Sequence, residues 1–223
     1  MNTHTKEKYK EFVQRMRRIA DVRYANAVLQ WDQETYLPPK GAALRGQQMA
    51  TLSEIAHDLF TDASLGTLLN ELSAAKGLTE QEEKNIALTL EDYNKNKKYS
   101  SAFVRKMSEA TSQAYHAWID ARRQNSFRVF EKELAELVQL KKEETQILGY
   151  ATHPYDALLN EYEKGATVQW LDKLFDDLQV PLKALLNKIE NKTPPETHFL
   201  HQHFDKDAQW KFGLEILKLI GYD

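Results

Sequence analysis

Apolar residues recur every three or four positions along most of this chain, which is the spacing of one face of an α-helix. The first stripe of this kind consists of Val13, Met16, Ala20, Tyr24, Ala27 and Trp31. We expect the helix that carries it to end before Pro38-Pro39, because the residue before a proline is disfavoured in the helical conformation. The N-terminal part of the chain is therefore predicted to be one long helix.

The same spacing predicts further helices in the rest of the chain. Thr79 and Glu82 form a capping-box pattern, in which each side chain bonds the backbone of the other residue at a helix start. Gly77 and Gly149 are predicted to end the helices that precede them, Gly149 as a left-handed cap. The predicted helices cover about 42–60, 63–75, 80–97, 103–121, 127–148, 156–162 and 206–220.

One stripe crosses a proline. It consists of Leu171, Leu174, Leu178, Leu182, Leu185 and Ile189, and Pro181 lies within it. Proline removes a backbone donor from the helix, so the pattern predicts either a kink or two abutting helices. Residues 191–202 follow as the one longer loop, and short connections elsewhere favour antiparallel packing. We predict an all-α fold: a bundle-like antiparallel array of eight or nine helices, without a sheet, forming a single region over 1–223.

Composition narrows the classes of protein that this chain can belong to. It has 30 basic and 33 acidic residues, a net charge of -3, and therefore no general attraction for nucleic acid or anionic lipid. It has no cysteine, which excludes disulfides and thiolate chemistry. No stretch approaches the roughly 20 apolar residues that span a bilayer, and the N-terminus has no apolar signal core. We expect a cytoplasmic protein with no nucleic-acid or membrane partner.

Motifs for catalysis are missing from these 223 residues. None of the seven histidines is followed by glutamate, so the zinc motif H-E-x-x-H is absent. Glycine-rich phosphate loops and the serine motif G-x-S-x-G are absent as well. The cluster of His198, His201 and His203 suits either a polar loop or a metal site, and the loop is favoured because no carboxylate pattern completes a site. We infer that the chain holds no complete catalytic site and binds no cofactor of its own.

Two segments contain more aromatic and polar residues than packing requires, namely residues 31–39 and 153–163. Both lie at predicted helix ends, where capping and corner packing need such residues. The functional alternative is the wall of a groove that contacts a peptide through ring faces and carboxylates. The candidate groove residues are Trp31, Asp32, Tyr36, Arg45, Tyr155, Asp156 and Tyr162.

The two segments, in this order, resemble the carboxypeptidase Taq family of zinc metallocarboxypeptidases. The first match consists of Leu29, Trp31, Asp32, Thr35, Pro38, Pro39, Gly41 and Ala42, with Leu37 where methionine is usual. Further matches are Trp118, Ala121, Arg122, Asn125, Phe127 and Phe130, then Leu137, Leu140, Lys141, Glu143, Glu144, Leu148, Gly149 and Tyr150, leading into 153–163. The last match consists of Phe204, Gln209, Phe212, Gly213, Leu217, Gly221, Tyr222 and Asp223; Lys164-Gly165 stands where the family has Pro-Gly.

The resemblance implies removal of C-terminal residues from peptides by a metal-activated water, with zinc or a similar divalent metal in the complete enzyme. The family's H-E-x-x-H lies after the point where this chain ends, and the family tends to form homodimers. The same resemblance implies that a cation of the enzyme binds the carboxylate of the substrate. Among Arg23, Arg45, Arg122 and Arg123, we prefer Arg45 for this role. We expect this chain to be the N-terminal helical part of such an enzyme and to be inactive alone. The alternative is a helical protein-interaction module without catalytic activity.

Overall fold

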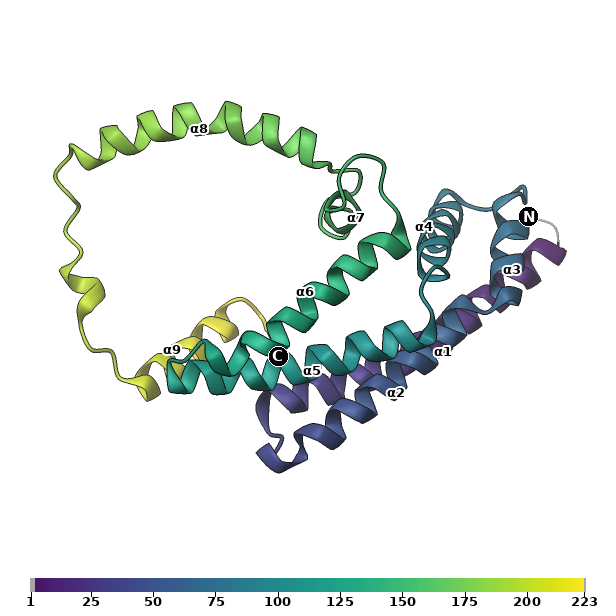
Figure 1. Ribbon diagram of the computed structural model, residues 1–223, viewed down its shortest axis with the longest axis horizontal. Coiled ribbons are helices and arrows are strands. Elements are labelled where there is room, and N and C mark those ends of the chain that lie inside the picture. Colours follow the sequence, from purple (N-terminus) through teal and green to yellow (C-terminus); the bar gives the residue numbers. More distant parts are fainter. Residues whose placement is uncertain (1–2, 223) are drawn as a thin grey trace. The chain divides into compact units, whose positions relative to one another are not determined.

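The structure is a computed structural model and describes residues 3–222. Over this range it contains helices, turns and loops but no strand (Figure 1), which confirms the all-α prediction. The α-helices are α1 (Thr3–Thr35), α2 (Ala42–Thr61), α3 (Ala63–Ser73), α4 (Glu80–Asn96), α5 (Ser101–Gln124), α6 (Arg128–Leu148), α7 (Asp156–Leu159), α8 (Val168–Glu190) and α9 (Lys206–Leu219), with two 3-10 helices, η1 (Pro39–Gly41) and η2 (His198–His201). Asp223, the last residue of the sequence match, lies outside the described residues.

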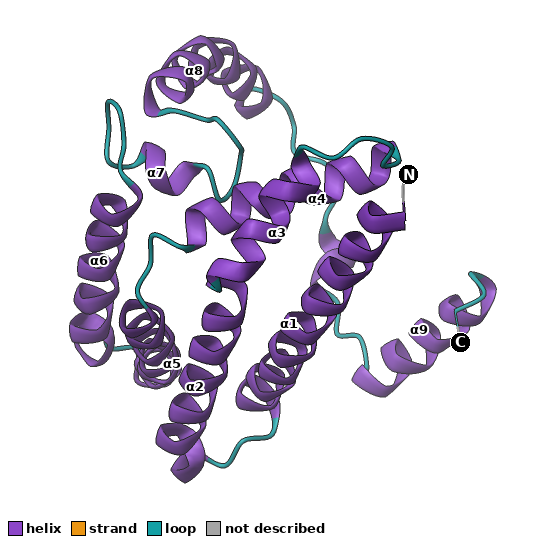
Figure 2. Ribbon diagram, turned by 90° about the vertical axis from the view of Figure 1, so that its right-hand side faces the viewer, coloured by secondary structure: helices purple, strands orange, loops and turns teal. Residues whose placement is uncertain are grey.

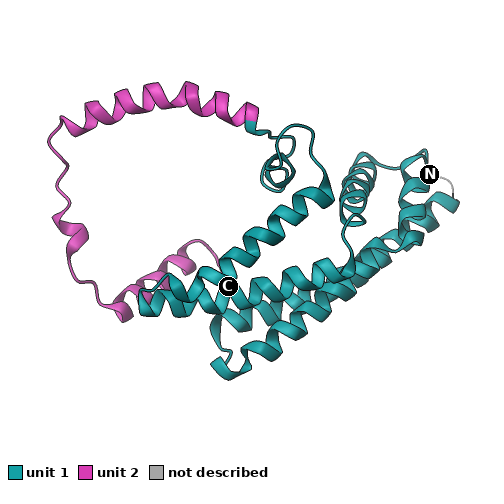
Figure 3. Cartoon of the chain, viewed as in Figure 1, with its two compact units in different colours: residues 1–168 teal, residues 169–223 magenta. Residues whose placement is uncertain are grey.

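The helices fall into two compact units, one formed by residues 1–168 and one by residues 169–223 (Figure 3). The first unit contains α1 to α7, and the second contains most of α8 together with η2 and α9. The single region over 1–223 that we expected from the sequence stays a prediction. Each unit is described by itself below.

Four long helices of the first unit pack in series, each antiparallel to the next. Along the α1–α2 pair, Arg23 lies over the Phe60 ring, Asn26 bonds Ser53, and Asp32 pairs with Arg45, so numbers rise on one helix as they fall on the other. Helix α5 runs back along α2 in the same manner, and α6 runs back along α5 (Figures 1 and 2). Short connections predict this antiparallel packing for α1–α2 and for α5–α6, whereas α3 and α4 separate α2 from α5 in the chain.

The main hydrophobic core lies where α1, α2, α3 and α4 meet. Its fully buried side chains include Leu65, Leu69 and Leu72 of α3 and Ile86 of α4. Helices α3 and α4 approach closely at Gly66, where a Cβ atom would lie 2.3 Å from the Tyr93 hydroxyl oxygen. A smaller cluster of Phe103, Ala110 and Leu140 joins α5 to α6.

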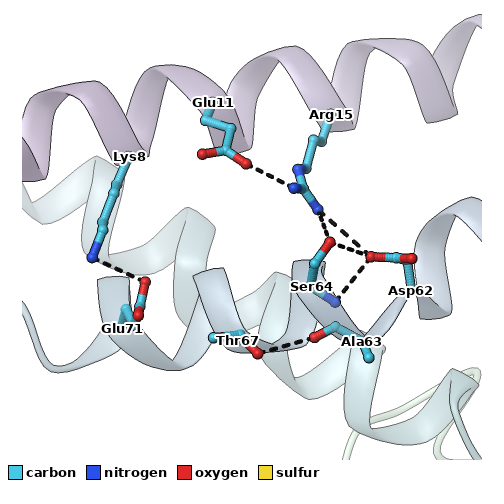
Figure 4. A network of polar contacts seen from close by, with 8 residues as sticks. All are labelled: Lys8, Glu11, Arg15, Asp62, Ala63, Ser64, Thr67 and Glu71. Atoms are coloured by element: carbon cyan, nitrogen blue, oxygen red, sulfur yellow. Dashed lines mark hydrogen bonds and ion pairs between the residues drawn. The ribbon is translucent and has the colours of Figure 1, made fainter.

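Capping residues set most helix ends. The predicted capping box of Thr79 and Glu82 is present at the start of α4. Asp62 separates α2 from α3 and accepts hydrogen bonds from the backbone and hydroxyl of Ser64; the hydroxyl also receives a bond from Arg15 (Figure 4). Gly149 has the predicted positive φ of 77°, but its ψ of 154° lies outside the left-handed helical region. The left-handed cap of this unit that sequence reasoning missed is Asn125, which ends α5.

The end of α7 and the course of the chain at Pro181 differ from what the sequence predicted or left open. Helix α7 ends at Leu159, three residues earlier than predicted, because Glu161 and Tyr162 donate to Leu158 and Leu159 in three-residue turns instead of continuing the helix. Helix α8 continues through Pro181 as one arched helix (Figure 1), so the alternative of two abutting helices is wrong.

Helix α8 dominates the second unit, and none of residues 169–222 is buried. The apolar stripe across Pro181 lies exposed, with Leu174, Leu178 and Leu185 each about half accessible to solvent. The predicted loop over 191–202 is present and contains the short helix η2. This unit has helices but no core of its own within the described residues.

Candidate functional site

The first predicted segment forms the corner between α1 and α2, and Arg45 closes it. The Arg45 guanidinium donates to Asp32 Oδ2 at 2.5 Å and to the Leu29 carbonyl oxygen at 2.9 Å. The Arg45 side chain is 14% exposed and that of Asp32 is 32% exposed. These contacts join the start of α2 to the last two turns of α1. A peptide carboxylate would have to compete with Asp32 for this guanidinium.

The aromatic pair at the same corner points outward. The rings of Trp31 and Tyr36 meet edge to face with centroids 5.4 Å apart, and both side chains are more than half exposed. Edge-to-face pairing holds each ring in a defined orientation while leaving apolar surface in water. The pair can therefore contact a ligand without rearrangement of the core.

In the second predicted segment, Asp156 organises the backbone around α7. Its Oδ1 accepts from the Val168 N–H at 2.8 Å, and its Oδ2 accepts from the His153 N–H at 3.2 Å. His153 Nδ1 accepts in turn from the Tyr155 N–H at 3.1 Å. The carboxylate of Asp156 thus caps the first turn of α8 and fixes the turn before α7, which is the capping role weighed from the sequence.

The structure does not bring the two segments together. The hydrogen bonds, ion pairs and ring contacts described for Trp31, Tyr36 and Arg45 all stay within the α1–α2 corner. Those of Asp156 stay within residues 153–168. Both views of the first unit place α7 well away from that corner (Figures 1 and 2). The candidate residues therefore belong to two separate surfaces, and their roles in substrate binding stay predictions.

An apolar groove of about 680 Å³ lies between α5, α6 and the α7 segment. Its lining includes Leu134, Leu137 and Val138 of α6 and Tyr155 and Leu158 around α7. Lys141, Lys142 and His153 supply its basic side chains, and no carboxylate lines it. The groove therefore suits a ligand with apolar side chains and negative charge.

A charged cleft of about 490 Å³ lies on the other side of the α7 segment, against α4 and the end of α6. Lys95 pairs with Glu161 across it, and Lys164 pairs with Glu91 at 2.9 Å. Lys98 donates to the Leu148 carbonyl oxygen at 2.6 Å. Sequence reasoning missed this cleft, because its charges come from helix surfaces that are far apart in the chain.

Next to this cleft, Glu144 is a buried carboxylate on α6. It accepts from the Tyr99 hydroxyl at 2.8 Å and pairs with Lys141 at 2.7 Å. Burial, and then the bond to Glu144, raise the pKa of Tyr99 far above its ordinary value of 10.0. Burial lowers the pKa of Lys95 below 10.5. The sequence signal for this cluster was Glu144 itself, one turn after Leu140 on the apolar stripe of α6.

The other residues considered from the sequence include two further arginines and the histidine cluster. Arg23 lies 4.9 Å from the centre of the Phe60 ring, and Arg123 lies 3.9 Å from Asp120 on the surface of α5. His198, His201 and His203 are exposed, and the His198 N–H donates to Glu196. Across residues 3–222, no three histidine, aspartate or glutamate side chains lie close enough together to hold a metal ion. Within the same range, no helix has the length and apolar character to cross a bilayer.

Comparison with known proteins gives consistent matches. The family model for carboxypeptidase Taq (M32) metallopeptidase matches residues 11–223. Carboxypeptidase 1 of Bacillus subtilis is 33% identical over the whole chain, and thermostable carboxypeptidase 1 of Pyrococcus furiosus is 31% identical over 97% of it. In both cases the chain spans 44% of the relative's length, less than half.

Solved structures agree with these matches. A crystal structure titled BsuCP superimposes with a TM-score of 0.91 at 30% identity, over 97% of this chain and 44% of that one. A structure titled CHT is 57% identical over the same shares, with a TM-score of 0.78. The helical arrangement described above is therefore the arrangement found in part of these larger proteins.

Proposed function

The chain belongs to the carboxypeptidase Taq (M32) metallopeptidase family, and we propose that it supplies the helical wall of a peptide-binding groove in a metallocarboxypeptidase. The observation that carries the proposal is the apolar groove beside Tyr155, together with the family match over residues 11–223. Family membership favours this function over a helical interaction module without catalytic ancestry.

The chemistry of the groove fits the end of a peptide chain. A carboxypeptidase substrate presents side chains and a terminal carboxylate at its reacting end. The groove offers apolar surface from Leu134, Val138 and Leu158, and Lys142 at its edge can attract a carboxylate. Because no acidic side chain lines the groove, nothing in it repels that carboxylate.

In the complete enzyme, a divalent metal would polarise the scissile carbonyl and activate a water molecule. The described residues do not fit such a metal, since they form no group of three donors. We therefore assign them the binding and positioning of the peptide. The α1–α2 corner, with Trp31, Tyr36 and the Arg45–Asp32 pair, belongs to this proposal as a second contact surface.

Partners and location are the remaining parts of the proposal. A peptide substrate, a homodimeric assembly and a cytoplasmic location are what the family resemblance and the sequence lead us to expect. The same holds for the absence of a nucleic-acid partner, for which the net charge of -3 is the support.

A substitution in the groove tests the proposal. Val138→Glu places a carboxylate in the apolar groove at a side chain that is 46% exposed, so the fold should tolerate it. We expect this variant to bind a fluorescently labelled peptide with an apolar C-terminal residue about ten-fold more weakly, because the new carboxylate repels the peptide carboxylate. Fluorescence anisotropy measures the change.

The matched control is Val180→Glu, at a side chain of α8 that is 72% exposed and outside the groove. It should leave peptide affinity unchanged. Equal affinity of the two variants would count against the groove as the peptide site, provided that both keep the circular dichroism of the parent chain.

A further inference from the structure

The segment between α6 and α8 is a weakly packed strap beside the charged cleft. We define the α7 strap as residues 150–167, which contain α7 and the turns on either side of it. Ala166 is its single buried residue, at 7% exposure. A segment that buries so little apolar surface has a low free energy of local opening compared with the core.

Two crossed ion pairs fasten the α7 strap to α4. On α4, Glu91 and Lys95 are one helical turn apart; on the strap, Glu161 and Lys164 are three residues apart. Lys164 pairs with Glu91 at 2.9 Å, and Lys95 pairs with Glu161. Each pair joins a cation of one element to an anion of the other, so the two pairs set the register between strap and helix.

A glycine directly before the strap, Gly149, and one near its end, Gly165, have conformations that other residues avoid. Gly149 has a φ of +77° and Gly165 a φ of +81°, and a Cβ atom on either would meet nothing within 4 Å. The backbone conformation, and not crowding, is therefore what requires glycine at these positions. Residues at element ends that absorb changes of φ and ψ are the usual hinges of moving segments.

Hydrogen bonds inside the strap hold its own shape. Within the strap, Asp156 bonds the backbone of His153, and Asn160 Oδ1 accepts from the Gly165 N–H at 3.1 Å. Asp156 also accepts from the N–H of Val168, the first residue of α8, so the first turn of α8 is tied to the strap. These bonds do not involve α4. The strap can therefore leave α4 as a unit, without first losing its internal turns.

We propose that the α7 strap is a salt-sensitive closing element, which releases from α4 at its two ion pairs while α4, α5 and α6 stay folded. Release widens the charged cleft, whose wall the strap forms through Asp156, Asn160 and Glu161. It also moves Tyr155 and Leu158, which line the apolar groove on the other side of the strap. The inference rests on the two ion pairs and the two glycine hinges, and not on the proposed peptidase function.

Amide hydrogen exchange, followed by mass spectrometry on the full chain, measures the opening directly. Raising the salt concentration from 0.1 M to 1 M shortens the screening length from about 10 Å to about 3 Å. The exchange of strap peptides should then become about two- to five-fold faster, the factor expected for loss of exposed ion pairs. Peptides from the buried helix α3 serve as the internal reference and should not change.

Charge reversal tests the ion pairs themselves. Lys164→Glu should accelerate exchange over 150–167 by a similar factor at low salt and remove much of the salt effect. Glu91→Lys combined with Lys164→Glu rebuilds the pair in reverse and should restore most of the protection. Lys173→Glu is the matched control, since it breaks the Lys173–Asp177 pair within α8 and should leave the strap unchanged.

Either of two results would overturn the proposal. One is strap exchange that responds to neither salt nor Lys164→Glu. The other is acceleration in Lys164→Glu that appears equally in α3 and α4, which would mean that the strap opens through unfolding of the whole unit.

Discussion

At the scale of single residues, Glu144 shows how one polar side chain can change the character of a helix face. It stands one turn after Leu140 on the stripe that packs α6 against α5, and it is buried with Tyr99 and Lys141 as partners. A buried carboxylate needs such partners, because loss of hydration is costly. The stripe itself could be read from the sequence. The identity of the partners could not, because Tyr99 lies 45 positions away and reaches Glu144 through the packing of α5 on α6.

Replacing Tyr99 with phenylalanine should therefore cost stability. Tyr99→Phe keeps the ring that stacks on Phe103 but leaves Glu144 without its hydroxyl donor. We expect a loss of about 1–3 kcal/mol at pH 7, the usual cost of removing a hydrogen bond to a charged group. Urea unfolding measures it, with Tyr24→Phe on the exposed face of α1 as the control that should be neutral.

The same variant has a defined pH signature. The pKa of Tyr99 is raised in the folded state, so its favourable contribution is complete below pH 10.0 and is lost as pH rises further and the unfolded phenol ionises. The lowered pKa of Lys95 changes stability with pH in the opposite direction, because the cost of burying the charged amine is relieved as pH rises towards 10.5. Both chains carry Lys95, so the difference between parent and Tyr99→Phe should shrink above pH 10. A difference that grows there would contradict the assignment.

At the scale of elements, the sequence predicted helices well because their periodicity is local, and it predicted ends less well where several turns compete. The capping box at Thr79 is a short-range pattern and was predicted correctly. The end of α7 depends instead on three-residue turn bonds that follow Leu159. Pro181 lies inside one helix, although the pattern also allowed a break there. The two aromatic segments were recognised, but their separation depends on long-range packing that no local pattern contains.

The cap between α2 and α3 should be measurable in its own right. Asp62→Ala removes the acceptor for the Ser64 N–H and Oγ–H, and with it the carboxylate that pairs with Arg15 (Figure 4). We expect a loss of about 0.5–2 kcal/mol at pH 7, the range for such caps. The Ser64 hydroxyl is the main cause of the lowered pKa of Asp62, so this contribution is complete above pH 3.8 and is lost as pH falls below it. Thermal unfolding at pH 7 and pH 3 should show a smaller effect of the variant at pH 3.

The contact between α3 and α4 offers a test with an internal control. Gly66→Ala would place a Cβ atom 2.3 Å from the hydroxyl oxygen of Tyr93, whose ring is held in the core against Phe60. Overpacking of this kind costs about 1–3 kcal/mol. Gly213→Ala is the matched control in α9, where a Cβ meets nothing within 4 Å, and it should be neutral or stabilising because alanine favours helix. Equal effects of the two substitutions on urea unfolding would argue against the close approach.

At the scale of the whole molecule, the apolar stripe of α8 carries the last prediction. Its leucines are well placed for packing, yet within the described residues of the second unit they are exposed. Exposed apolar surface of this extent drives association, and the chain spans 44% of the relatives that it matches. We expect the purified chain to self-associate as its concentration rises, and light scattering measures the change in mass. Leu178→Glu with Leu185→Glu places charges on the stripe and should shift the mass towards that of a monomer, whereas Lys173→Glu on the same helix should not. A parent chain that stays monomeric at high concentration would show that the stripe does not drive association.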